Sequence, residues 1–244
     1  MISSVSNLIT AKSIWISDVH LGSCGTQETL LFDFLDNISC ENLFLNGDII
    51  DKWLLKNNGE FNNGLEIFKL RLRTIQNSGT SIVFFPGNHD DLDVLYSFFS
   101  EFKCLDELCY VTKKGKRYLI FHGDKLDYSV HYRNKTLSWL GTYIYEFILK
   151  INKKKCKSRN FSKRLKLFIK NIFYFVFRYK KYLFNYLVAN NYDGVICGHS
   201  HQPKISKLNS KDYFNSGDWV DNCTFLLETL EGEFQLLRWE LSSL

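Results

Sequence analysis

The sequence has little proline, only 2 residues in 244, and 14 glycines. Collagen-like and low-complexity chains are richer in these residues, so both classes are excluded. The chain also lacks the composition of a disordered protein, because 45% of its residues are hydrophobic and 23% are charged. That apolar fraction is enough for a sizeable core, and the length suits one large domain or two small ones.

No apolar run is long enough to cross a membrane. The most apolar one, 167–177, contains Lys170 and is far shorter than the ~20 residues that a spanning helix needs. The first residues include neither a charged segment nor an apolar one, so we expect no secretory signal. The seven cysteines are scattered without a CxxC pair, which is typical of reduced thiols. We therefore expect a cytoplasmic protein.

Acidic residues are missing from one long segment. Residues 147–192 include 13 Lys or Arg and no Asp or Glu, whereas the remainder of the chain has 18 basic and 26 acidic residues. The formal net charge of +5 is therefore an average over an acidic body and a basic segment.

Short apolar runs rich in Ile, Val and Phe predict buried strands. The runs are 13–17, 42–46, 81–85, 118–121 and 194–197. Apolar residues three and four apart predict helices at about 28–38 and 64–77, and this alternation predicts an α/β fold with a parallel or mixed sheet. Further strand-like segments suggest an antiparallel end of a sheet at 204–208, 211–215, 224–229 and 233–240.

The region 128–190 has a different pattern, with apolar residues repeating at helical spacing. We predict that it is a helical cap inserted within a single domain, 1–244. Its aromatic and basic residues suit contact with an anionic membrane or a lipid substrate, where each Lys or Arg near the surface contributes ~1 kcal/mol. Nucleic-acid binding and a plain lid with a solvated basic face are the alternatives, and the first of these is the least favoured.

Polar residues cluster directly after the predicted strands, and five of the six histidines are among them. The set is Asp18, His20, Asp48, Asn88, His89, His122, Asp124, His199 and His201. Glycines beside most of them permit the tight turns that bring short side chains to a central point. Open α/β sheets hold ligands where strands end, so we expect these residues to share a site.

Imidazole nitrogens and carboxylate oxygens together suit Mn, Fe or Zn better than Ca. About seven ligands are too many for one tetrahedral ion, but they suit two ions that share a carboxylate. Two ions ~3.5–4 Å apart stabilise both the entering and the leaving oxygen of a phosphoryl displacement. A buried histidine or an Asx turn is the favoured explanation of any single motif, whereas five motifs in series favour a metal centre.

The ordered series D-x-H, G-D, G-N-H-D, H-G-D and G-H-x-H resembles the calcineurin-like metallophosphoesterases. This resemblance implies a sandwich of two mixed β-sheets flanked by helices, with the inserted helical cap. It implies that Asp18, His20 and His201 bind a first metal. It also implies that Asn88, His122 and His199 bind a second, while Asp48 bridges the two.

The resemblance also implies a mechanism. A hydroxide between the metals is the expected nucleophile, because coordination lowers the pKa of water towards ~7. His89 is the expected catalytic residue that contacts the phosphate and protonates the leaving oxygen, and Asp90 is expected to orient it. The expected cofactors are two divalent ions, Mn²⁺ by resemblance to the family, with Fe or Zn as alternatives.

Four longer segments look like the UDP-2,3-diacylglucosamine pyrophosphatase-like branch, over roughly 12–240. They are 122–127, 137–141, 193–199 and 215–220. That branch hydrolyses a lipid A precursor to UMP and a lipid sugar 1-phosphate, and its cap receives acyl chains at the inner membrane. Asp127, Arg133 and Asn215 are candidate substrate contacts, although helix-start or turn positions explain them nearly as well.

One residue departs from that branch, whose established members carry Arg after the metal-binding Asn where this chain has His89. His89 matches the general phosphoesterase pattern, so a soluble phosphodiesterase or nucleotide phosphatase is the alternative enzyme. A further alternative is a basic module that binds membranes or nucleic acid and whose metal site only stabilises the fold.

Overall fold

The structure is a computed structural model, and it describes residues 2–23, 25–52, 61–124 and 179–241. The chain divides into two compact units, residues 1–123 with 187–244 and residues 124–186. Most of the predicted cap lies outside the described residues, as do Asp127 and Arg133. In its C-terminal part the structure describes α7, Tyr179–Ala189. The cap and its boundaries stay a prediction.

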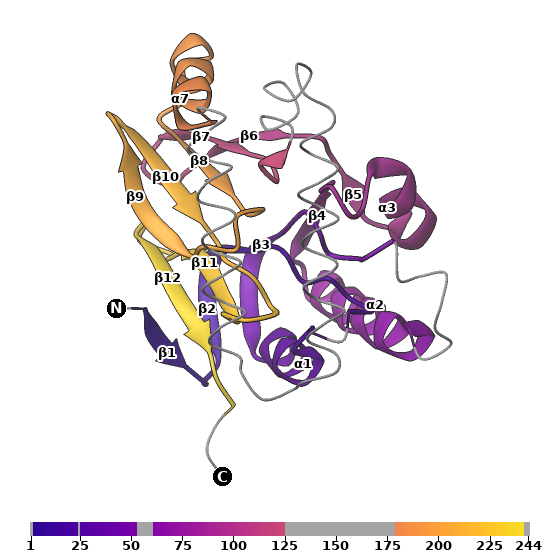
Figure 1. Cartoon of the computed structure of the whole chain (residues 1–244). Coiled ribbons are helices and arrows are strands. Elements are labelled where there is room, and N and C mark those ends of the chain that lie inside the picture. Colours follow the sequence, from indigo (N-terminus) through magenta and orange to yellow (C-terminus); the bar gives the residue numbers. More distant parts are fainter. Residues whose placement is uncertain (1, 24, 53–60, 125–178, 242–244) are drawn as a thin grey trace, which may run out of the picture. The chain divides into compact units, whose positions relative to one another are not determined.

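The first unit contains a seven-stranded sheet in the order β1-β12-β11-β2-β3-β4-β5 (Figure 1). Its strands are β1 Ser3–Val5, β2 Ile9–Ile16, β3 Ile38–Asn46, β4 Ser81–Phe85, β5 Lys103–Cys104, β11 Thr224–Glu228 and β12 Phe234–Trp239. Strands β2 to β5 are parallel, and β11 pairs antiparallel with β2. The carboxyl ends of β2, β3 and β4 therefore meet at one edge of the sheet.

A second sheet has five strands in the order β6-β7-β8-β10-β9. They are β6 Leu108–Val111, β7 Arg117–Ile120, β8 Gly194–Cys197, β9 Lys204–Leu208 and β10 Lys211–Asn215. The parallel pair β7 and β8 join segments that are far apart in sequence, on either side of the predicted cap.

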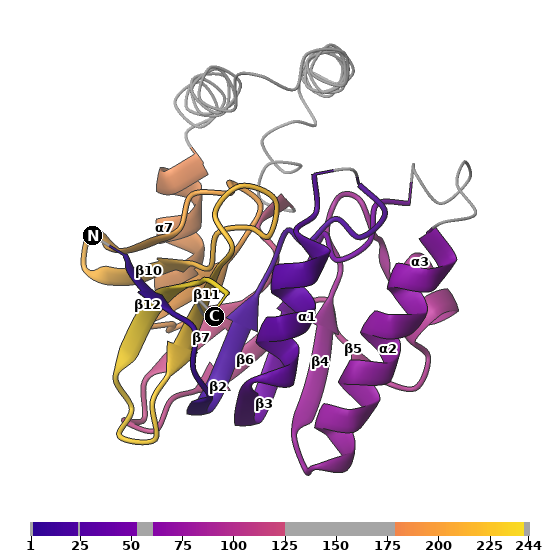
Figure 2. The ribbon, with the colours of Figure 1, turned by 90° about the horizontal axis from the view of Figure 1, so that it is seen from below.

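Three helices cover the seven-stranded sheet, and Figure 2 shows α1 and α2 running alongside its parallel strands. They are α1 Glu28–Asp36, α2 Phe61–Asn77 and α3 Leu92–Phe99. Their buried apolar residues, such as Phe34, Phe68 and Phe99, form one core cluster with the facing residues of β2, β3 and β4. Helix α3 begins where the Asp91 side chain accepts a hydrogen bond from the backbone N–H of Val94, as a good N-cap does.

A second core cluster lies between the two sheets and contains apolar residues from both of them. Trp15 of β2 stacks on Phe44 of β3, with ring centroids 5.2 Å apart, and meets Tyr110 of β6 edge-on. The two sheets therefore face one another. The segments that follow β2 in one sheet and β8 in the other lie close together.

The predicted α/β sandwich of two mixed sheets is confirmed. Strands at 81–85, 194–197, 204–208 and 211–215 have the predicted bounds. Strands β1, β5 and β6 and helix α3 were not predicted, because each is too short for its periodicity to be recognised.

Candidate metal centre

The residues that follow the buried strands come together as the motifs predict. Three groups of side chains each place one ligand atom per residue within 4.8 Å of the others. The groups are Asp18/His20/His201, Asp48/His122/His199 and His20/Asp51/His89. The first two groups hold six of the seven predicted metal ligands, divided as the two predicted metal sites require.

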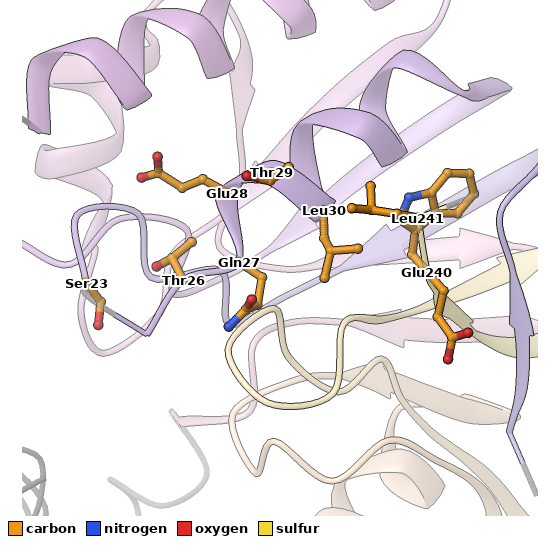
Figure 3. A pocket seen from close by; sticks show the side chains of 9 residues that line it. Ser23, Thr26, Gln27, Glu28, Thr29, Leu30, Glu240 and Leu241 are labelled. Atoms are coloured by element: carbon orange, nitrogen blue, oxygen red, sulfur yellow. The ribbon is translucent and has the colours of Figure 1, made fainter. Parts of the chain in front are cut away.

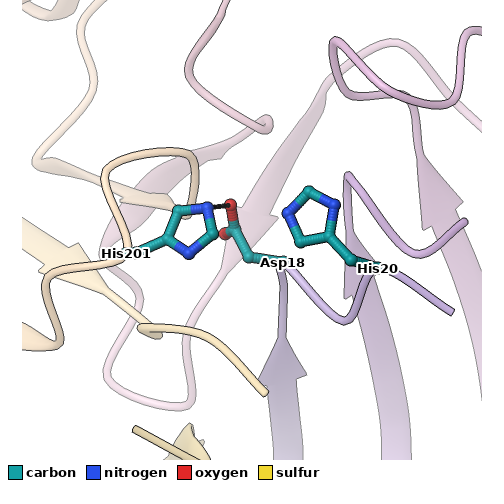
Figure 4. Close-up of side chains that lie close together, drawn as sticks. All are labelled: Asp18, His20 and His201. Carbon is teal, nitrogen blue, oxygen red and sulfur yellow. Dashed lines mark ion pairs between the residues drawn. The ribbon is translucent and has the colours of Figure 1, made fainter. Parts of the chain in front are cut away.

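In the first group, His201 faces Asp18 at the end of β2 (Figure 4). Nε2 of His201 lies 2.9 Å from Oδ1 of Asp18, and the rings of His20 and His201 stack with centroids 5.4 Å apart. The other oxygen of Asp18 accepts a hydrogen bond from the backbone N–H of His199 at 2.9 Å. Asp18 therefore joins the segment after β2 to the segment after β8.

In the second group, Oδ2 of Asp48 lies 3.3 Å from Nε2 of His122. The same oxygen lies 3.9 Å from Nε2 of His20, which belongs to the first group. Nδ1 of His122 is 2.9 Å from the carbonyl oxygen of Asn46, and a proton on Nδ1 makes Nε2 the nitrogen with the lone pair that a metal ligand needs. Asp48 lies between the two groups, where a bridging ligand has to be.

The backbone of this site is unusual. Eight non-glycine residues in the described part of the chain have a positive φ, and five of them are predicted ligands. These five are Asp18, His20, Asp48, His199 and His201, with φ between 52° and 62°. Left-handed backbone is unfavourable for such residues and concentrates at functional sites, where surrounding contacts hold it in place.

Two glycines make room for the ligands. A Cβ on Gly87 would lie 2.2 Å from Oδ1 of Asp48, and one on Gly198 would lie 2.5 Å from Oδ2 of Asp18. Neither position has room for a side chain. Both positions therefore require glycine because a ligand carboxylate packs against the backbone there, and not only because the chain turns.

The contacts of the Asp90 side chain differ from those predicted. Its buried carboxylate accepts backbone N–H groups from Gly87, Asp48, Ile49 and Ile50 at 2.6–3.0 Å. These bonds tie the segment after β4 to the segment after β3 and hold Asp48 in its left-handed conformation. Asp90 therefore supports Asp48, and another carboxylate contacts the ring of His89.

That carboxylate belongs to Asp51, which the sequence reasoning missed. Oδ2 of Asp51 lies 3.4 Å from Nδ1 of His89, and the His89 backbone N–H donates to Oδ1 of Asp48 at 2.8 Å. The signal available in the sequence was the spacing G-D-x-x-D, which places Asp51 three residues after Asp48.

Burial and neighbouring charges shift the pKa values of the site residues. Burial would raise the pKa of Asp18 and of Asp48, but the neighbouring histidines outweigh it and lower both well below the ordinary value. Burial lowers the pKa of His20 to about 4. The pKa of His89 rises to about 9, because Asp48 and Asp51 outweigh the effect of burial. Burial and the charge of Asp48 raise the pKa of Asp90 to about 7.

These residues fit divalent cations. Asp18 and Asp48 are buried, and Nε2 of His20 is a buried atom with no hydrogen-bond partner among the residues that the structure describes. Buried carboxylates and a neutral imidazole with an open nitrogen are the donors that Mn, Fe and Zn take.

The remaining predicted residues differ in position. Asn88 lies in the segment after β4 with its side chain exposed, so its role as a ligand stays a prediction. Asn215 is buried, and its amide donates to the carbonyl of Gly198 at 2.5 Å and to Oγ of Ser200 at 3.1 Å. It therefore supports the segment that carries His199 and His201, and its predicted substrate contact stays untested.

A cavity of about 580 Å³ lies elsewhere, at the start of α1 (Figure 3). Ser23, Gln27 and Glu240 are among the residues that line it. None of the predicted site residues lines this cavity, so it is not the candidate centre.

Substitution of Gly87 by Ala tests the close packing around Asp48. We expect a loss of about 1–3 kcal/mol in the free energy of unfolding, because the new methyl group would overlap Asp48. The matched control is Gly64→Ala in α2, whose methyl would meet only the end of the flexible Glu28 side chain. Thermal denaturation measures both, and equal stability of the two variants would contradict the packing described here.

Comparison with known proteins places the chain in a family. The family model for calcineurin-like phosphoesterase matches residues 11–203. A UDP-2,3-diacylglucosamine hydrolase of Wigglesworthia glossinidia brevipalpis is 28% identical and covers 83% of this chain and 84% of its own length. The UDP-2,3-diacylglucosamine hydrolase of Vibrio atlanticus (strain LGP32) is 24% identical, and the match covers 95% of this chain and 99% of the relative's own length.

Among solved structures, an archaeal phosphodiesterase aligns over 92% of this chain and 98% of its own, with 14% identity and a TM-score of 0.43. The divalent metal ions that this fold implies agree with the two groups of donors. The chain belongs to the calcineurin-like phosphoesterase family, as a metal-dependent hydrolase similar to the UDP-2,3-diacylglucosamine hydrolases.

Proposed function

We propose that this chain hydrolyses the pyrophosphate bond of a UDP-linked, acylated sugar of the UDP-2,3-diacylglucosamine type, releasing UMP and a lipid sugar 1-phosphate. The observation that carries the proposal is the pair of donor groups on either side of Asp48, which suits two divalent ions. The names of two relatives that cover most of this chain supply the substrate class.

Two divalent ions, which we propose to be Mn²⁺, would supply positive charge to the phosphoryl oxygens and an activated water when bound. Asp18, His20 and His201 would hold one ion, and His122, His199 and Asn88 the other. Asp48 would contact both.

His89 has the position of an acid for the leaving oxygen. Its Nδ1 faces Asp51, which leaves Nε2 as the nitrogen that can contact substrate. The carboxylates of Asp48 and Asp51 raise the pKa of His89 above its ordinary value, which favours the protonated imidazole that an acid requires. Positioned acids of this kind contribute 10²–10⁴ in rate.

The first test is turnover of two substrates, measured by mass spectrometry with Mn²⁺ present. We expect kcat/KM for UDP-2,3-diacylglucosamine to exceed that for a soluble UDP-sugar by at least about 100-fold, because buried acyl carbons add binding energy of ~0.8 kcal/mol each. Asp48→Asn is the control, and it should abolish turnover.

Two results would change the conclusion. Equal kcat/KM for the acylated and the soluble substrate would favour a soluble phosphodiesterase or nucleotide phosphatase, which His89 also suits. Turnover of neither, with Asp48→Asn changing only stability, would favour the non-enzymatic binding module.

His89→Ala tests the proposed acid. We expect kcat to fall by about 10²–10⁴ while the metal content stays at the parent level, because His89 is not assigned as a ligand. Elemental analysis of the purified protein measures the metal content beside the kinetics. Loss of bound metal in this variant would make His89 a ligand instead.

We further propose that the basic segment 147–192 contacts an anionic membrane surface and that the protein is cytoplasmic and peripheral on the inner membrane. Supporting this, Lys180 and Lys181 of α7 are exposed, and the side chain of Tyr182 is 45% exposed. In the part of the chain that the structure describes, no helix is long and apolar enough to cross a membrane.

Reversing two of these charges tests the membrane contact. We expect Lys180→Glu/Lys181→Glu to lower binding to anionic vesicles at least about tenfold, because each basic residue near the surface contributes ~1 kcal/mol. Co-sedimentation measures it, and Lys103→Glu/Lys204→Glu is a control with the same charge change on other exposed lysines. Equal loss in both pairs, or stronger binding to duplex DNA than to vesicles, would count against the membrane.

A further inference from the structure

The loop between β10 and β11, residues 216–223, packs against the first donor group. The Trp219 backbone N–H donates to the carbonyl of Asp18 at 3.1 Å. The Asn222 side-chain amide donates to the carbonyl of His201 at 3.0 Å. The loop thus holds the left-handed backbone of both residues from outside the two segments that carry them.

Asp218 lies at the centre of this loop and is fully buried. Its Oδ1 accepts the backbone N–H groups of Val220, Asp221 and Asn222 at 2.5–3.1 Å. These bonds fix the carboxylate in place. Its Oδ2 contacts the Asn222 amide and lies 3.8 Å from Nδ1 of His201.

His201 is therefore held between two buried carboxylates. Nε2 faces Asp18 at 2.9 Å, and Nδ1 faces Asp218 on the opposite side of the ring. Among the described residues, His201 is the only ion-pair partner of Asp218. Three backbone N–H groups and the Asn222 amide compensate the buried charge of Asp218, and they hold its Oδ2 on the Nδ1 side of the His201 ring.

A carboxylate behind a ligating imidazole fixes the ring and increases its basicity as a ligand. The equivalent nitrogen of His122, in the second group, lies 2.9 Å from the backbone carbonyl oxygen of Asn46, which is an uncharged acceptor. The two groups are alike in burial, because each has two buried ligands and one half-buried ligand. They differ in the group behind an imidazole, which is a carboxylate in the first group and a neutral carbonyl in the second.

We propose that Asp218 is a positioning residue that orients His201 and makes the first group, Asp18/His20/His201, the tighter of the two cation sites. This inference rests on the proposed metal-dependent function. It assigns to the Asn-Ser-Gly-Asp-Trp-Val segment a role in metal affinity, in addition to its role as a loop between two strands.

The experiment measures Mn²⁺ binding to the full chain by isothermal titration calorimetry, beside thermal denaturation of the metal-free protein. In Asp218→Asn, we expect the tighter Mn²⁺ equivalent to weaken by about 10- to 100-fold and the other to stay within about twofold. Asp221→Asn is the matched control, because Asp221 lies in the same loop with its side chain exposed. It should bind both equivalents as the parent does.

A purely structural role would lower the melting temperature of metal-free Asp218→Asn and leave both Mn²⁺ affinities unchanged, and that result overturns the inference. If Asp218→Asn does not fold, Asn222→Ser decides, because it removes the amide that contacts Asp218 and the His201 carbonyl. The inference then requires that Asn222→Ser binds the tighter Mn²⁺ equivalent more weakly than the parent does. Unchanged affinity for that equivalent overturns it. A parent protein that binds no Mn²⁺ overturns the proposed function as well, whereas an unaffected Asp218→Asn overturns this inference alone.

Discussion

The structure of the centre depends on two carboxylates, Asp18 and Asp48, buried where the strands of both sheets end. Among the described residues, their ion-pair partners are histidines and include no lysine or arginine. Two negative charges without permanent cations are costly in a protein interior, and dications are the groups that compensate them best. The surrounding residues can be understood as a frame that keeps these carboxylates and imidazoles close together.

That frame has two parts, one behind each carboxylate. Asp90 collects four backbone N–H groups around Asp48. Asp218 and Asn222 do the equivalent for His201, which faces Asp18. Each support stabilises left-handed backbone by hydrogen bonds that the ligands themselves cannot supply. The strain that brings the ligands together is therefore balanced by buried polar groups which take no direct part in the chemistry.

The sequence was sufficient for the longer strands and for most of the residues at their ends. Runs such as 81–85 are apolar, β-branched and bounded by glycine and proline, so both their type and their ends could be recognised. Which side chains contact one another could not be predicted in the same way. Asp90 was assigned to His89 because the two are adjacent in the chain, whereas in space Asp51 is the residue beside that ring. A side chain's direction depends on turn geometry, and no spacing rule supplies the φ of Asp48 or His199.

The sequence leaves the role of Asp218 open between a site contact and a turn for a related reason. An Asx turn between two strands explains its sequence context, and only the packing of that loop against His201 gives it another meaning. The same holds for Asn215, whose amide is satisfied by the segment of Gly198 and Ser200. Contacts between residues distant in sequence decide these roles.

The hydrogen bond from His199 to Asp18 spans 181 residues of sequence. Because translation proceeds from the N-terminus, the first donor group cannot exist on the ribosome until β8 and the loop after β10 have been made. The early segments, 9–46 and 81–90, can pair as parallel strands and still hold only Asp18, His20, Asp48 and their neighbours. Both donor groups thus become complete only when His201 has been made, so the centre assembles after most of the chain has left the ribosome.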